Sequence, residues 1–240
     1  MNRDQSPFRY LGWHALDVAR GPLVLYLVVS AMLSFISWKM AQAMPVVPTP
    51  DVFQAQTADA TLTLAVLLAT AGIISADRHN GWYRAWFSKP IAPWWYYLQR
   101  WLLGLGAVLL APVFLGIGQV IVLKSGTGIT ADLLGTIALG YLLIGSTALL
   151  LAHVTQREWL LVFVLAAAQR GLAGLVKLGV ELPSYAEPVF KALPPFHLIA
   201  PEEPMLTGQP LLHVAAYGLA MLVAALVLVE KRALGSGGRA

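Results

Sequence analysis

The chain has 240 residues, of which 58% are hydrophobic and 12% are charged, and its mean hydropathy is +0.69. Soluble domains carry about 25% charged residues, so this composition excludes an ordinary soluble enzyme and an intrinsically disordered chain. The absence of cysteine excludes disulfides, thiolate metal sites and cysteine nucleophiles. In such a chain the net charge of +4 reports loop topology rather than affinity for nucleic acid. The sequence predicts one polytopic membrane domain over residues 1–240, with the lipid membrane and no nucleic acid as a partner.

The first 20 residues precede the apolar part of the chain, and Phe8–Arg20 has the pattern of an amphipathic helix. Its apolar face carries Leu11, Ala15, Leu16 and Ala19, and its polar side carries Arg9, Asp17 and Arg20. This pattern predicts a helix that lies in the membrane interface. A solvated N-terminal tail is the alternative.

Six apolar stretches are long enough to cross a bilayer, which takes about 20 helical residues each. They are residues 22–38, 58–76, 101–123, 133–152, 160–180 and 211–229. None alternates as the strands of a barrel do, so the predicted fold class is an all-α polytopic membrane protein with six transmembrane helices. The first stretch resembles a signal peptide because Ala41-Gln42-Ala43 follows it, but Asp4 and Asp17 precede it, and we expect a retained helix.

The distribution of Lys and Arg predicts the orientation of these helices. If both termini lie on one side, that side holds Arg3, Arg9, Arg20, Arg78, Arg84, Lys89, Arg100, Arg157, Lys231, Arg232 and Arg239. The other side holds only Lys39, Lys124, Lys177 and Lys191. The side with more positive charge faces the cytoplasm, so both termini are predicted to be cytoplasmic.

The motifs of common catalytic sites are missing. Lys124–Gly128 resembles a phosphate-binding loop, but its lysine precedes the glycines instead of following them. The chain also has no H-E-x-x-H and no G-x-S-x-G motif. The five histidines are scattered, and no pair of acids lies inside the predicted spans. We therefore expect no catalytic, metal or cofactor site on this chain.

One strong charge lies inside a predicted span. Arg170 follows Gln169 near the middle of residues 160–180. A charge at this depth is costly unless it faces protein or water, which favours a substrate path or a subunit interface. The alternative is a structural arginine that reaches the interface or pairs with a backbone carbonyl.

The most polar and aromatic interior segment lies between the second and third predicted spans. Asp77 is suited to cap a helix there, because its carboxylate accepts from free backbone N–H groups. Trp82 and Trp86 recur at helical spacing, and Lys89-Pro90 predicts the end of the helix. The pattern predicts a short basic and aromatic helix along the cytoplasmic membrane surface, after which Trp94–Tyr97 re-enter the interface. It is either an interfacial anchor or a docking element for a cytosolic partner.

The order of residues in this segment resembles the ABC-2 type permeases. The similarity is carried by Asp77, Arg78, Gly81, Arg84 and Ser88-Lys89-Pro90, followed by an aromatic run. The resemblance implies a cytoplasmic coupling helix that docks on an ATPase, here with Asp77, Arg78, Gly81, Trp82, Arg84, Trp86, Ser88, Lys89 and Pro90. It also implies an interfacial helix before the first span and a long last extracellular loop at Pro183–Pro210, which in the family often forms short or re-entrant helices.

The expected function is therefore the transmembrane permease subunit of an ATP-driven exporter in the bacterial cytoplasmic membrane. This chain would not itself be an enzyme, because ATP-Mg would bind a separate ATPase subunit. A second permease copy or a related permease is the expected partner, and Ala216, Ala220 and Ala224 would permit close helix contact. A transporter or channel without ATP and a non-transporting assembly subunit stay open as alternatives, as do the substrate and the choice between homodimer and heterodimer.

Overall fold

The computed structural model describes residues 11–18, 24, 28, 32, 70, 73, 74, 77, 92–123, 131–180, 183, 188, 192–199 and 208–236. The predicted spans 22–38 and 58–76 lie outside this set, apart from Val24, Val28, Met32, Thr70, Ile73 and Ile74. Every regular element in the described part is helical, and no strand occurs there. The prediction of helices rather than strands is confirmed for these residues.

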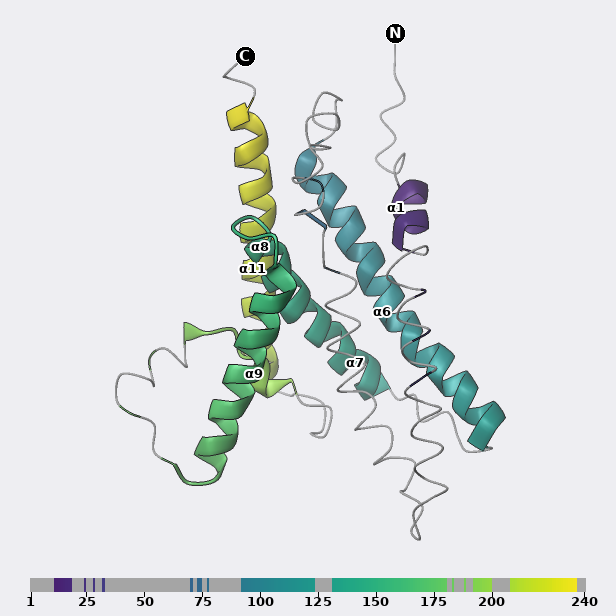
Figure 1. Ribbon diagram of the computed structural model, residues 1–240, viewed down its shortest axis with the longest axis vertical. Helices are drawn as coiled ribbons and strands as arrows, with labels where there is room; N and C mark the ends of the chain where they lie inside the picture. Colours follow the sequence, from purple (N-terminus) through teal and green to yellow (C-terminus); the bar gives the residue numbers. More distant parts are fainter. Residues whose placement is uncertain are drawn as a thin grey trace.

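The described elements lie between residues 93 and 236, apart from one N-terminal helix (Figure 1). They are α1 (Leu11–Val18), α6 (Pro93–Leu123), α7 (Ala131–Gly140), the π-helical turn η2 (Tyr141–Gly145), α8 (Ser146–Leu151), α9 (Glu158–Lys177), the 3-10 turn η3 (Phe196–Leu198) and α11 (Gln209–Ser236). Three continuous helical stretches are long and apolar enough to cross a membrane: Ala131–Leu151, Glu158–Lys177 and Gln209–Lys231. These features are those of a helical membrane protein.

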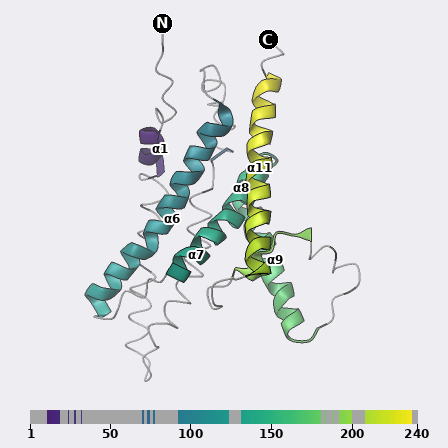
Figure 2. The same ribbon diagram turned by 180° about the vertical axis from the view of Figure 1, so that it is seen from behind.

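The long helices run in alternating directions. Helix α1, the start of α6 and the end of α11 lie at the same end of the molecule, which we call the α1 end (Figures 1 and 2). Helix α1 packs beside the first half of α6, and α11 packs on α8 and η2. The stretch α7–η2–α8 lies between α6 and α11 and contacts both. It is therefore the centre of the described bundle.

The helix ends follow local chemistry. Helix α6 begins at Pro93, where the fixed φ of proline suits the first helical position. Helix α9 has Glu158 in its first turn and Lys177 in its last. Each charge is opposite in sign to the partial charge at its end of the helix, which is the stabilising arrangement. After α9 the chain turns at Gly179 with φ of 82°, and the Val180 N–H donates to the Leu175 carbonyl at 3.1 Å. This bond is typical of a helix that a left-handed glycine ends.

The start of α6 differs from the sequence prediction. Trp94–Tyr97, expected as an interfacial stretch before a span at residue 101, form the first turns of the helix itself. Tyr96 and Tyr97 are buried, while Trp94 is exposed. The aromatic run therefore serves two purposes, because one side of it packs inside the protein and the other stays outside.

The core is built mainly from the central stretch. Tyr141, Leu143 and Leu149 are fully buried there, and the fully buried Val162 of α9 and Val214 of α11 belong to the same cluster. By contrast, α9 and α11 expose many large apolar side chains. That distribution suits helices that border on lipid, because lipid chains are as apolar as the side chains they touch.

Candidate functional site

Asp77 lies in a polar cluster at the α1 end of the molecule, where it meets α6. Its carboxylate Oδ1 is 3.9 Å from Nη1 of Arg100, and the Tyr97 side chain lies near enough to feel the charge of the same carboxylate. Tyr97 and Arg100 stand three residues apart on α6, so both reach the same side of the helix. We call these three residues the Asp77 cluster.

The side chains of the Asp77 cluster are mostly withdrawn from solvent. Those of Arg100 and Asp77 are only 17% and 12% exposed, but their separation of 3.9 Å is longer than the roughly 2.7–2.9 Å of a charge-assisted hydrogen bond. Burial, and after it the negative charge of Asp77, raise the pKa of Tyr97. Its hydroxyl is the neutral neighbour of the carboxylate, and Arg100 is the charged one. Asp77 therefore meets α6 at this cluster.

Helix α1 is attached to the same place. The His14 ring meets the Tyr96 ring edge to face, with centroids 4.4 Å apart, and Tyr96 in turn meets Tyr97 at 5.1 Å. His14 is buried, whereas Leu11 and Leu16 of the same helix are exposed. The predicted apolar face of Phe8–Arg20 thus points away from the protein at these two leucines, and the polar histidine makes the contact with α6.

Asp77 is the single member of the predicted coupling helix that falls in the described part of the chain. Arg78, Gly81, Trp82, Arg84, Trp86, Ser88, Lys89 and Pro90 lie outside it. Asp77 itself is helical, and its side chain is engaged by α6. The described structure therefore shows Asp77 itself attached to α6.

Gln169 and Arg170, predicted to face a path or an interface, bind a returning loop instead of each other. The Gln169 side chain is fully buried; its Oε1 accepts from the backbone N–H of His197 at 3.3 Å and lies 3.1 Å from His197 Nδ1. Gln169 Nε2 donates to the Leu193 carbonyl at 3.4 Å, and Nη2 of Arg170 donates to the Ile199 carbonyl at 2.9 Å. The bond of Arg170 to a backbone carbonyl is the one expected under the alternative of a structural arginine.

A third side chain holds the same loop from α11. The Tyr217 hydroxyl donates to the Ala192 carbonyl at 2.6 Å. Gln169, Arg170 and Tyr217, together with the loop at residues 192–199, are called the loop clamp below. Arg170 lies twelve residues after Glu158, about 18 Å along α9. The loop therefore returns to well inside the length of α9, on the side away from the α1 end.

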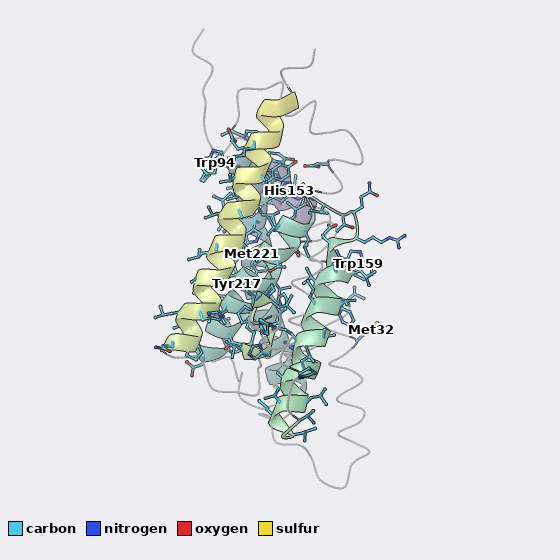
Figure 3. All side chains as sticks on the ribbon, turned by 90° about the vertical axis from the view of Figure 1, so that its left-hand side faces the viewer. Met32, Trp94, His153, Trp159, Tyr217 and Met221 are labelled. Atoms are coloured by element: carbon cyan, nitrogen blue, oxygen red, sulfur yellow. The ribbon has the colours of Figure 1, made fainter. Side chains whose placement is uncertain are left out.

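Several of these residues escaped the sequence analysis. Tyr97 and His14 were hidden in stretches that looked interfacial, and nothing in their own pattern indicates a buried partner. His153 is buried in the turn after α8, with Nε2 3.0 Å from the Ala225 carbonyl of α11 (Figure 3). Glu158 is also buried. Both lie between the predicted spans 133–152 and 160–180, and this position is the weak signal that the sequence offers.

Within the described ranges, no group of three or more His, Asp or Glu side chains is placed to hold a metal ion. Comparison of the chain with known protein families, with curated proteins and with solved structures finds no match in any of the three. The function must accordingly be argued from the chain's own residues.

Proposed function

We propose that the chain is the membrane-spanning permease subunit of an ATP-driven ABC-2 type exporter in the bacterial cytoplasmic membrane. In this proposal six helices cross the membrane and both termini are cytoplasmic. ATP and Mg²⁺ bind separate ATPase subunits, and a second permease copy or a related permease completes the path. Segment 78–90 is the contact through which the ATPase acts.

The observation that carries the proposal is the Asp77 cluster. A membrane subunit without its own nucleotide site responds to ATP only if a cytosolic contact moves its helices. Segment 78–90 directly follows Asp77 in the sequence, and Asp77 pairs with Arg100 at 3.9 Å and lies near Tyr97. A force on this segment would therefore reach the first turns of α6. A simple lipid anchor has no need of that attachment.

The arrangement of helices supports the proposed topology. Helix α1, the start of α6 and the end of α11 share the α1 end (Figure 1). Of the described basic residues, Arg100 lies in the first turns of α6 and Lys231 and Arg232 lie in the last turns of α11, so the positive-inside rule favours a cytoplasmic location for that end.

The sharpest experiment is photo-crosslinking in cells. A photoreactive amino acid replaces Trp86, and the crosslinked partner is identified by mass spectrometry. The control carries the same amino acid at Leu212, which is 67% exposed at the opposite end. We expect an ATPase with Walker motifs to be captured from position 86 and not from position 212. Capture of no such ATPase from position 86 would contradict the proposal.

Coupling is tested separately from contact. Interfaces are dominated by arginine and rigid aromatic residues, so Arg84→Glu should release the ATPase or uncouple its ATP hydrolysis from transport. Gly81→Pro should do the same by breaking the predicted helix, since proline costs about 3 kcal/mol in a helix interior. Both variants should still insert and dimerise. Wild-type ATPase binding and transport in both would reduce the segment to an interfacial anchor.

The topology is open to cysteine labelling because the chain has no cysteine. A cysteine at Pro50 or Gly208 should react with an impermeant reagent in intact cells, and a cysteine at Gly235 should not. The reverse pattern would contradict cytoplasmic termini.

A further inference from the structure

The centre of the bundle contains one turn that is not α-helical. Between α7 and α8, residues Tyr141–Gly145 form a π-helical turn, which holds more residues than an α-helical turn. The Thr147 hydroxyl donates to the Leu143 carbonyl at 2.7 Å. A hydroxyl that bonds back to the preceding turn competes with the regular ladder and bends a helix. Thr147 therefore helps to stabilise the irregular turn.

One side of η2 is joined to α6. The Tyr141 hydroxyl donates to the Trp101 carbonyl at 2.8 Å, and the two rings lie 4.9 Å apart. Gly145 lies so close to this pair that an added methyl group would stand 3.3 Å from Nε1 of Trp101 and 3.0 Å from Cγ2 of Thr70. Trp101 directly follows Arg100 in the chain. The Asp77 cluster and η2 are therefore separated by a single peptide bond and one buried hydrogen bond.

The other side of η2 is joined to α11. A methyl group on Gly218 would stand 2.8 Å from Cγ of Leu142 and 3.1 Å from the Leu142 carbonyl oxygen. Only a glycine lets the two backbones approach so closely. The neighbour of Gly218 is Tyr217, whose hydroxyl belongs to the loop clamp. Figure 3 shows Trp94 of α6 toward the α1 end and Tyr217 of α11 farther toward the opposite end.

We infer that η2 is a conformational relay between the Asp77 cluster and the loop clamp. The chain of contacts is continuous: Asp77 to Tyr97 and Arg100, Arg100 to Trp101, Trp101 to Tyr141, Leu142 to Gly218, and Tyr217 to Ala192. Coupling over such a distance requires an element with two discrete arrangements. A π-helical turn supplies it, because closing to an α-helical turn rotates and shifts the residues on one side relative to the other.

In a relay, unlike in a static bundle, a movement at the Asp77 cluster changes the loop clamp, and a change at the loop clamp moves the Asp77 cluster. A shift of α6 at the Asp77 cluster pulls on the Trp101 carbonyl, turns η2 and moves Gly218, so that Tyr217 releases the Ala192 carbonyl. Binding energies are linked reciprocally, so a change at Tyr217 must also be felt at the start of α6. The use of this relay in export rests on the proposed function, but its existence does not.

The test measures hydrogen–deuterium exchange in the purified full chain in lipid nanodiscs without any ATPase. The reporter is the peptide over residues 192–199, where the His197 N–H is bonded to Gln169. Asp77→Asn should raise exchange there at least about threefold, near the lower end of couplings along such networks. Thr155→Val is the control off the relay: it removes a side-chain oxygen that accepts a hydrogen bond, here from the Arg157 N–H at 3.1 Å. It should leave the reporter unchanged.

Two further measurements make the outcome decisive. In a Tyr141→Phe background, Asp77→Asn should add nothing to exchange at residues 192–199, since the relay is already cut. Tyr217→Phe, a substitution at the edge of the bundle that leaves the core intact, should raise exchange at residues 92–100. Additive effects of Asp77→Asn and Tyr141→Phe, or no response at residues 92–100, overturn the relay. Neither result bears on whether position 86 captures an ATPase, so the two proposals fail separately.

Discussion

The stretches Ala131–Leu151 and Glu158–Lys177 are nearly equal in length and hydropathy, yet the protein uses them differently. In the first, 56% of the apolar stretch is buried inside the protein, and in the second only 17%. The hydroxyls of Tyr141 and Thr147 make hydrogen bonds within the bundle, whereas Gln169 and Arg170 bind a loop. Apolarity identifies a helix that suits the membrane, but it does not tell a core helix from a peripheral one.

Glycine positions show the same difference at closer range. Gly145 and Gly218 lie where η2 touches its neighbours, and a methyl group at either would meet atoms at 3.0 Å or less. Around Gly171 and Gly174 of α9, a methyl group would meet nothing within 4 Å. Close backbone approach is therefore a property of the central stretch, while α9 has open space on its glycine side.

The largest expected effect comes from filling one of these contacts. Gly218→Val should lower the free energy of unfolding by about 3 kcal/mol, because the Leu142 backbone carbonyl has no room to move away. Thermal unfolding in detergent, followed by tryptophan fluorescence, measures the loss. Gly171→Val is the matched control and should change stability by less than about 0.5 kcal/mol. Similar losses in both variants would mean that the two helices do not differ in packing.

The sequence is informative about helices and weak about their partners. The apolar runs predict helices where α6, α7–α8, α9 and α11 are found, because burial or lipid contact needs the same residue types. The π-helical turn has no local signature: Tyr141–Gly145 reads as an ordinary apolar stretch. The contacts at this turn come from the Thr147 hydroxyl, which donates to the Leu143 carbonyl, and from Gly218, which is distant in the chain.

The polar residues show the same limit. Asp77 could be singled out from its position, but its neighbours Tyr97 and Arg100 are 20 or more residues away; Tyr97 looked like part of an interfacial stretch and Arg100 like one of the cytoplasmic charges. Gln169 and Arg170 stand out as polar groups in an apolar run. Their partners are backbone atoms of the loop at residues 192–199, and every residue has such atoms. No residue pattern can therefore identify them.

The second prediction concerns the buried amide of the loop clamp. Gln169→Leu keeps most of the volume but leaves the Leu193 carbonyl and the His197 N–H without their partner, which should cost about 2 kcal/mol. The loss should stay local, so limited proteolysis at residues 192–199 should accelerate more than tenfold while the unfolding temperature changes little. Ala168→Leu, at the exposed neighbouring position, should leave the cleavage rate unchanged.

A smaller effect is expected for Arg170. Its bond to the Ile199 carbonyl is charge-assisted but half-buried, so Arg170→Ala should loosen the loop by about 1.5 kcal/mol, seen as roughly tenfold faster proteolysis. Membrane insertion should stay normal, since removal of a charge eases insertion. If the loop position matters for export, transport falls as well. Unchanged proteolysis together with lost transport would instead favour a direct contact of Arg170 with the substrate path.

The smallest effect tests the polar interior of the central stretch. Tyr141→Phe removes the hydroxyl that donates to the Trp101 carbonyl at 2.8 Å and keeps the ring contact at 4.9 Å. Because Trp101 lies inside α6, its carbonyl keeps its helical hydrogen bond and is not left unsatisfied. The loss should therefore be that of one net hydrogen bond, about 1 kcal/mol.

Phe163→Leu, on the exposed face of α9, is the control and should change stability by less than about 0.5 kcal/mol. Chemical unfolding curves of both variants, with equal slopes, measure the difference. An equal or larger loss for Phe163→Leu would mean that the outer face of α9 is covered by protein, and the contrast between the two stretches would then disappear.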